Sequence, residues 1–195
     1  LGESPADGMP IAFPCAMQTV ATGDAKVLAD WLGEWLGGGG SLLFMTDYDG
    51  TLTPLVPNPA DAWLGPRVQR QLYALARAPR VRLAVISGRD LADVRTRVGV
   101  PGAIYSGCHG LVIDGPGITF SHPEAVAQQS TVRAIGETLA RRAVAIQGMQ
   151  VEPKRLGVTV HYRHVPDEAR REVEEELARA IQGEGGRLKI FHGTK

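Results

Sequence analysis

The chain has 195 residues, which is enough for one large domain or two small ones with a hydrophobic core. Hydrophobic residues make up 44% of it and charged residues 22%, as in ordinary globular proteins. The 21 basic and 21 acidic residues give a formal net charge of zero, so no overall field favours binding to nucleic acid or to an anionic membrane.

The two cysteines, Cys15 and Cys108, are too few for a disulfide framework and lack the spacing of metal ligands. They favour a reducing, cytoplasmic compartment. No apolar run approaches the ~20 residues of a membrane span, and the first residues lack the layout of a secretion signal. The sequence opens with Leu1 rather than Met, so we expect its natural start to lie upstream.

Residues 1–24 are rich in proline and glycine, which predicts an irregular lead-in. Apolar residues at helical spacing then predict a short amphipathic helix over 26–36. Four glycines at 37–40 would end this helix. The glycine run could serve as a hinge to another domain upstream, but a loose loop is the simpler interpretation.

The next segment, SLLFMTDYDGTLT at 41–53, is the most informative part of the chain. Residues 42–45 predict a buried parallel strand, apolar on both faces. Asp47 and Asp49 follow at its carboxyl end, where open α/β sheets bind their ligands. Two carboxylates here cost free energy unless positive charge neutralises them, as a hard cation and a transferring phosphoryl group would. The alternative is an Asx-rich turn that caps the next helix.

A second strand-to-site unit follows, with a helix over 67–77 and a β-branched strand over 81–86. The strand ends in Ser87, and a right-handed parallel crossover would put this residue beside Asp47. Ser87 could equally be the N-cap of the next helix. The two interpretations are compatible, because a helix N-terminus also favours an anion.

A helix over 91–98 and a third strand over 103–105 come next, and the strand leads into Cys108 and His109. His109 is either a turn residue bonded to its own backbone or a site residue, since the third parallel strand ends at the same crevice. Cys108 has no neighbouring base and orienting group, so we interpret it as structural.

After residue 110 the pattern changes to helices paired with antiparallel strands, which indicates a separate α+β module. The predicted elements are a hairpin over 111–120, a helix over 123–145 weakened by Gly136, strands over 148–152 and 156–163, a charged helix over 167–181 and a last strand over 187–191. We therefore predict a lead-in with a short helix at 1–40, a core at 41–112, and a cap inserted after the third core strand at 113–195.

Glu152 and Lys154 stand two residues apart on a predicted strand or tight turn, so they can project to the same side. A carboxylate that accepts hydrogen bonds and an ammonium that donates them suit the hydroxyls of a neutral sugar. The alternative is a surface hairpin with solvated charges, which such isolated spacing favours by itself.

Several motifs carry a family resemblance. The string FMTDYDGTLTP at 44–54 resembles the D-x-D-G-T signature of the haloacid-dehalogenase superfamily of phosphotransferases. Together with ISGR at 86–89, GCHG at 107–110, EPK at 152–154 and HYR at 161–163, it resembles the trehalose-6-phosphate phosphatases from about residue 41 onward. Cys108 departs from the Asn, Ser or aliphatic residue expected between Gly107 and His109.

The resemblance implies an α/β fold, with a haloacid-dehalogenase-like Rossmannoid parallel-sheet core and an inserted α+β cap. It makes Asp47 the nucleophile that forms an aspartyl-phosphate, and Asp49 the general acid and base. Both aspartates would also hold Mg²⁺. The implied phosphate- and substrate-binding residues are Gly50, Thr51, Ser87, Gly88, Arg89, His109, Glu152, Lys154 and Arg163.

The implied activity is Mg²⁺-dependent hydrolysis of trehalose 6-phosphate to trehalose and phosphate, the last step of trehalose biosynthesis. The resemblance implies no nucleic-acid or membrane partner, and a trehalose-phosphate synthase as a fused or separate partner. Alternatives are another capped sugar-phosphate phosphatase, such as one for sucrose phosphate or mannosyl-3-phosphoglycerate, and a non-catalytic sugar-phosphate-binding domain fused to a synthase.

One expected feature does not appear in the sequence. Members of the superfamily carry, beyond the cap, a phosphate-binding Lys and a Gly-Asp-Asp segment that completes the Mg²⁺ site. The sequence as far as Lys195 supplies neither. We therefore interpret the chain as a fragment of a longer phosphatase, incomplete in both core and cap, and expect residues 1–195 alone to be inactive.

Overall fold

The computed structural model describes residues 25–182, 184 and 186–191. The chain falls into two units, of which the first ends at Ser41 and the second runs over Leu42–Lys195. The predictions for residues 1–24, including Cys15, lie outside the described residues.

The first unit contains the helix α1 (Ala25–Gly37), which confirms the helix predicted over 26–36. The rings of Trp31 and Trp35 stack with their centroids 6.2 Å apart. The chain leaves the helix at the glycine run, where the indole Nε1 of Trp35 donates to the carbonyl of Ser41 at 3.1 Å. A Cβ at Gly40 would lie 2.3 Å from the Trp35 ring, so a side chain there would displace the ring.

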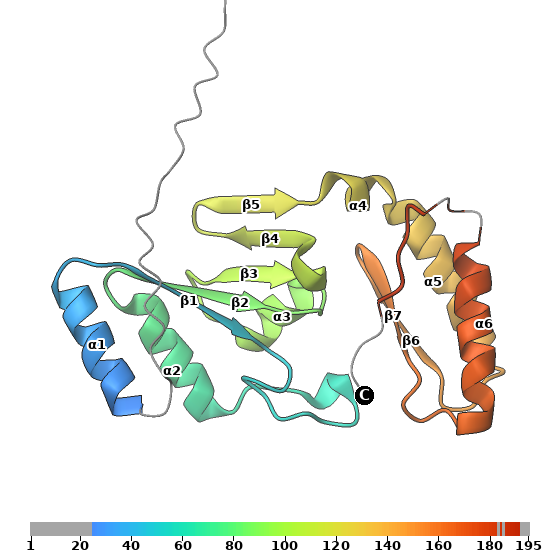
Figure 1. Cartoon of the computed structure of the whole chain (residues 1–195), viewed down its shortest axis with the longest axis horizontal. Helices are drawn as coiled ribbons and strands as arrows, with labels where there is room; N and C mark the ends of the chain where they lie inside the picture. The colour runs from blue at the N-terminus through green and yellow to red at the C-terminus, as the bar shows by residue number, and fades with distance from the viewer. Residues whose placement is uncertain (1–24, 183, 185, 192–195) are drawn as a thin grey trace, which may run out of the picture. The chain divides into compact units, whose positions relative to one another are not determined.

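The second unit is built on one five-stranded sheet with the order β1-β2-β3-β4-β5 (Figure 1). The strands are β1 (Leu42–Asp47), β2 (Val81–Ile86), β3 (Ile104–Gly107), β4 (Val112–Gly115) and β5 (Ile118–Ser121). The first three are parallel, and the last two continue the sheet in antiparallel fashion. Asp47 lies opposite Ile86, and Ile86 opposite Ser106, so the three parallel strands end level with one another.

Two helices cover this sheet, α2 (Pro66–Arg77) against β2 and α3 (Leu91–Val98) against β3. Both had been predicted within a residue of these bounds. Leu83 and Val85 of β2 share one face of the sheet and lie in the same buried cluster as Leu72 of α2 and Val94 of α3. This cluster is the core that supports the strand ends.

The prediction that residues 42–45 form a buried strand is wrong. Leu43 is 51% and Met45 59% exposed. In the described sheet β1 is an edge strand that pairs only with β2. Leu43 and Met45 also point to the face opposite Leu83, because their partners in the register are Arg82 and Ala84. The apolar run thus predicted a strand correctly, but its burial depends on neighbours that no local pattern reveals.

The boundary between core and cap also differs from the prediction. The hairpin that begins the predicted cap pairs with β3, so the core sheet extends past residue 112 to Ser121. The helix predicted over 123–145 is divided into α4 (Pro123–Ala127) and α5 (Gln129–Ala143) by the non-helical Gln128. The strand predicted over 187–191 is absent, because these residues pair with no described strand and Phe191 is 87% exposed.

The cap consists of a small β-sheet with a layer of helices on one side of it (Figure 1). The strands β6 (Gln150–Lys154) and β7 (Gly157–His161) are antiparallel, and α5 and α6 (Arg170–Ile181) pack together beside them. The short helix η3 (Asp167–Ala169) leads into α6, as predicted for 167–181. Gly136 of α5 is buried, and a Cβ there would lie 3.0 Å from Val158. It therefore permits close helix–strand packing and does not end the helix.

Candidate active site

The loop after β1 separates the two aspartates by one buried tyrosine. Tyr48 is fully buried, and its hydroxyl donates to the carbonyl of Ala62 at 2.7 Å. The Tyr48 carbonyl accepts the main-chain N–H groups of Leu52 and Thr53, which closes a tight turn. Because Tyr48 points into the core, the side chains on either side of it are released outward: that of Asp47 is exposed and that of Asp49 half-buried.

Two further predicted residues lie in this turn. Gly50 has φ +82°, a left-handed conformation that side chains rarely adopt, so glycine is required there. Thr51 follows it and is exposed. Both therefore lie on the open side of the turn with Asp47, and their predicted role as phosphate ligands stays a prediction.

The loop after β2 is joined to the loop after β3 by main-chain hydrogen bonds. The N–H of His109 donates to the carbonyl of Ser87 at 3.1 Å, and that of Cys108 to the carbonyl of Arg89 at 2.7 Å. Ser87 is buried, and its Oγ accepts the N–H of Arg89. Ser87 is not the N-cap of α3, because Asp90 fills that position with a bond from the N–H of Ala92.

His109 lies directly on this loop. A Cβ at Gly88 would be 2.4 Å from Cε1 of His109, so the imidazole packs on the bare backbone of Gly88. Cys108 and His109 have φ values of +51° and +57°, an uncommon conformation for residues other than glycine. His109 therefore contacts the neighbouring site loop, which goes beyond the interpretation as a turn residue bonded to its own backbone.

Arg89 is one of the most constrained side chains of the unit. It is 6% exposed, and its Nε and Nη2 donate to the two carboxylate oxygens of Asp49 at 2.9 and 2.8 Å. Its Nη1 donates to Asp93 at 2.9 Å, and Nη2 also to the carbonyl of Pro59 at 2.7 Å. Burial opposes the charge of Arg89, but the hydrogen bonds to Asp49 and Asp93 outweigh it and raise the guanidinium pKa above its ordinary range.

The cap presents a polar face. Val151, Val158 and Val160 pack into the helical side of the cap. The alternating residues Glu152, Lys154, Thr159 and His161 therefore share the opposite face, as the register shows. The prediction that Glu152 and Lys154 project to the same side is confirmed.

The tip of the β6–β7 hairpin reaches the loop after β2. Nζ of Lys154 donates to the carbonyl of Gly88 at 2.7 Å, and the N–H of Arg155 to Oδ2 of Asp90 at 3.0 Å. The Lys154 side chain is only 9% exposed, which argues against a solvated charge. Glu152 lies behind it, with Oε2 2.9 Å from Nε2 of His161 and Oε1 4.0 Å from Nζ of Lys154.

Arg163 differs from these residues. It lies beyond the end of β7 and is exposed, and none of the hydrogen bonds of the described residues joins it to Glu152 or Lys154. The structure thus brings together ten of the eleven predicted site residues in two neighbouring groups: the aspartate turn with the loops after β2 and β3, and the hairpin that contacts those loops.

The site fits a magnesium ion in part. No group of three or more His, Cys, Asp or Glu side chains in the described part of the chain could hold a metal ion. Mg²⁺ is nevertheless often bound by one or two carboxylates, with waters and substrate phosphate filling its other positions. Asp47 offers an exposed carboxylate, whereas the carboxylate of Asp49 is engaged by Arg89.

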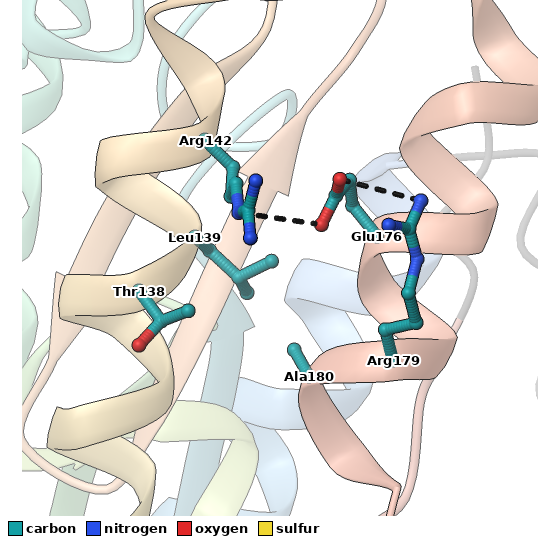
Figure 2. A pocket seen from close by; sticks show the side chains of 6 residues that line it. All are labelled: Thr138, Leu139, Arg142, Glu176, Arg179 and Ala180. Atoms are coloured by element: carbon teal, nitrogen blue, oxygen red, sulfur yellow. Dashed lines mark ion pairs between the residues drawn. The ribbon is translucent and has the colours of Figure 1, made fainter.

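A groove between α5 and α6 is a separate feature (Figure 2). Glu176 of α6 forms an ion pair across the groove with Arg142 of α5 at 3.9 Å, and a second ion pair along its own helix with Arg179 at 3.3 Å. It belongs to the helical layer of the cap and is lined by none of the predicted site residues. None of the helices within the described ranges is both long and apolar enough to span a membrane.

Known proteins provide an independent comparison. Residues 45–190 match the family model described as trehalose-phosphatase. The chain belongs to the trehalose-phosphatase family. This result confirms the resemblance inferred from the sequence motifs.

Two relatives and one solved structure illustrate the match. A trehalose-phosphate phosphatase of Mycobacterium tuberculosis (strain H37Rv) is 43% identical over 119 residues, which cover 60% of this chain and 30% of that protein. One of Mycobacterium avium is 38% identical over 176 residues, covering 86% and 43%. The chain thus spans less than half the length of the curated relatives it matches.

The C-terminal domain of the trehalose-6-phosphate phosphatase of C. albicans superposes with a TM-score of 0.65 at 24% identity, covering 85% of this chain and 57% of that one. This likeness confirms the predicted α/β fold.

Three residues outside the set of predicted site residues help to build the site: Asp90, Asp93 and His161. Asp93 stands four residues after Arg89, the spacing of an ion pair at the start of a helix. Asp90 directly precedes the apolar run of α3, which is an N-cap signal. His161 had been noted only as part of HYR, and its pairing with Glu152 depends on the strand register.

Proposed function

We propose that the gene product containing this chain hydrolyses trehalose 6-phosphate to trehalose and inorganic phosphate. One observation carries the proposal: the hairpin with Glu152 and Lys154 contacts the loop after β2, which lies next to the turn of Asp47 and Asp49. This contact supports a substrate site in which the polar face of the hairpin binds sugar hydroxyls and the carboxylate pair carries out phosphoryl transfer. Family membership and the names of the relatives support this substrate.

The chemistry proceeds in two displacements. A carboxylate oxygen of Asp47 attacks phosphorus, the bond from phosphorus to the sugar oxygen breaks, and Asp49 gives its proton to the departing alkoxide. Asp49 then takes a proton from a water molecule, which attacks phosphorus and releases phosphate and the free Asp47 carboxylate. The exposure of Asp47 suits it to the first step.

The surrounding groups bind and orient the phosphate. We assign this role to the turn at Gly50 and Thr51 and to Ser87 in the loop after β2. Mg²⁺, held by Asp47 and by oxygens of the same turn, would neutralise the phosphate charge. His109 supports the loop by packing on Gly88.

The sugar is assigned to the cap. Glu152 can accept hydrogen bonds from sugar hydroxyls, and Lys154 can donate them. Arg163 remains a candidate for the outer part of the sugar site because it is exposed near the end of β7. We place the enzyme in the cytoplasm, in keeping with the free thiol of Cys108, and a trehalose-phosphate synthase as its supplier, fused or separate.

The test is phosphate release by the complete gene product. Purified protein is incubated with trehalose 6-phosphate, sucrose 6-phosphate and glucose 6-phosphate, with Mg²⁺ or with a chelator. We expect Mg²⁺-dependent release, fastest from trehalose 6-phosphate. A preference for another sugar phosphate would favour the second candidate, a different capped phosphatase. Binding of trehalose 6-phosphate without turnover would favour a non-catalytic domain.

A further inference from the structure

Arg89 follows Ser87 and Gly88 in the loop after β2, a position from which a cation would be expected to bind phosphate. Its side chain is used differently. Of the five N–H donors of a guanidinium, four are engaged: two by Asp49, one by Asp93 and one by the carbonyl of Pro59. The side chain is 6% exposed, so little of it faces solvent or a substrate.

Only one N–H donor of Arg89 is left over, so bidentate phosphate binding by Arg89 would require some of these bonds to be broken. The pair with Asp49 is bidentate, with both nitrogen–oxygen distances below 3 Å, which is the strong and directional form of an ion pair. Breaking it would leave a buried guanidinium without its partner, which is costly. The geometry therefore argues against direct binding of the phosphate.

Both oxygens of Asp49 are fixed by this pairing. A carboxylate bound through one oxygen can turn about its last bond, whereas a planar fork that contacts both oxygens sets the plane and direction of the group. The side chain of Asp49 stays 39% exposed, so solvent can still reach the carboxylate beside the pair. A group that must exchange a proton at one defined point benefits from this constraint.

Arg89 is itself held from the other side. Asp93 accepts from Nη1 of Arg89, and both Asp93 oxygens accept from Nε of Arg97. Nη1 of Arg97 donates to the carbonyls of Ala60 and Ala62, and its guanidinium stacks 4.6 Å from the centre of the Trp63 ring. Opposite charges thus alternate along the side chains of Asp49, Arg89, Asp93 and Arg97, and backbone carbonyls of the segment over 59–62 bind both arginines.

We propose that Arg89 is a positioning residue that acts through Asp49 by fixing the orientation of its carboxyl group. In the first step this group carries the proton that passes to the sugar oxygen. Once ionised, and paired with Arg89 as in this structure, it takes a proton from water. This inference rests on the proposed function and assigns Arg89 a role other than phosphate binding. Asp93 and Arg97 complete the support.

The test is a double-mutant cycle in the complete gene product, with Arg89→Met, Asp49→Asn and the double variant. Arg89→Met keeps much of the length of the side chain and removes its donors. With trehalose 6-phosphate, whose alkoxide is a poor leaving group, we expect kcat to fall roughly tenfold or more and KM to change little. The double variant should be no slower than Asp49→Asn alone, because under the proposal Arg89 affects the rate only through Asp49.

A second substrate separates positioning from phosphate binding. p-Nitrophenyl phosphate has a good leaving group that needs little protonation, so the formation of phosphoenzyme from it should be much less affected by Arg89→Met. Multiplicative losses in the double variant, or a large rise in KM for both substrates, would overturn the proposal. Arg95→Met is the matched control, since Arg95 lies on the following helix, α3, and pairs with Asp114 at the surface.

A third measurement does not depend on activity. Arg89→Lys keeps the charge but cannot form the bidentate pair, and it serves where Arg89→Met does not fold. A crystal structure of this variant should show the Asp49 carboxylate turned from its wild-type orientation. An unchanged Asp49 would refute the positioning role. If wild-type protein hydrolyses other phosphate esters but not trehalose 6-phosphate, the substrate assignment fails. The double-mutant cycle of Arg89 and Asp49 can then still be measured with those esters.

Discussion

Asp90 bonds to both the core and the cap: its Oδ1 accepts the N–H of Ala92 at the start of α3, and its Oδ2 accepts the N–H of Arg155 at the tip of the β6–β7 hairpin. One side chain thereby caps a core helix and holds the cap against it. The neighbouring bond from Lys154 to the carbonyl of Gly88 lies beside this contact.

We predict that Asp90→Asn will loosen the cap without uncapping α3. Asparagine is as good an N-cap as aspartate, but its amide nitrogen cannot accept the N–H of Arg155. The loss of one hydrogen bond corresponds to about 1 kcal/mol. We expect KM for trehalose 6-phosphate to rise several-fold while the melting temperature changes little. Asp90→Ala, which removes both bonds, should lower the melting temperature as well. An unchanged KM in both variants would contradict the role in holding the cap.

We predict that Asp47→Asn lowers turnover by several orders of magnitude and leaves the fold intact. The amide cannot form the acyl phosphate, and positioning alone retains little of the rate. Asp47 is exposed, so the substitution removes no buried contact and the thermal unfolding curve should be unchanged. Asp30→Asn on α1, another exposed aspartate, is the control. Turnover comparable to wild type would remove Asp47 from the mechanism.

A separate prediction concerns the second step of the reaction. Asp49→Asn lacks the base that activates water, so phosphoenzyme should accumulate on Asp47 after a rapid first turnover with p-nitrophenyl phosphate. Quenched samples analysed by intact-protein mass spectrometry should show the added mass of a phosphoryl group. The double variant Asp47→Asn, Asp49→Asn should show none. Absence of the adduct in Asp49→Asn, with p-nitrophenolate still released at a steady rate, would contradict the assignment of Asp49 as base.

Local pattern was sufficient for most elements of the fold. Helices such as α2 and α3 follow from apolar spacing and charge, and the strand of Leu83 and Val85 from its β-branched alternation. The exposure of β1 could not be inferred in this way, because it depends on which strands pair on each side. The sequence does not predict the break at Gln128 either, because the residues on both sides of Gln128 are compatible with one continuous helix.

The candidate site likewise has features that the sequence predicts and features that it does not. The motifs placed Asp47, Ser87 and Lys154 in adjacent parts of the fold, because strand ends and alternation determine those positions. They could not reveal that the donors of Arg89 are engaged by Asp49 and Asp93. That arrangement depends on side-chain packing between segments forty residues apart, which sequence spacing does not encode.

Cys108 offers a test of the structural interpretation. Its side chain is buried, and desolvation raises the pKa of the thiol above its ordinary value of 9.0. In a Cys15→Ser background, we expect iodoacetamide to modify Cys108 slowly at pH 8 in folded protein and rapidly in urea. A raised pKa also means that the stability contribution of the neutral thiol is present below pH 9 and lost as the pH rises through the folded value. In Cys108→Ala, the free energy of unfolding should therefore fall less at alkaline pH than it does in the protein with Cys108. Rapid modification of folded protein would contradict the buried, structural role.

The last prediction concerns Glu152, whose carboxylate lies between His161 and Lys154 on the polar face of the cap. A carboxylate that accepts from sugar hydroxyls discriminates strongly, because its loss leaves buried hydroxyls unpaired. We expect Glu152→Ala to reduce kcat/KM for trehalose 6-phosphate tenfold or more, which corresponds to about 1.4 kcal/mol of transition-state binding. p-Nitrophenyl phosphate does not reach this face, so its hydrolysis should be nearly unchanged. Glu137→Ala, which removes an exposed helix ion pair with Arg133, should affect neither substrate. Equal losses on both substrates would instead mean that Glu152 supports the hairpin and its contact with the loop after β2.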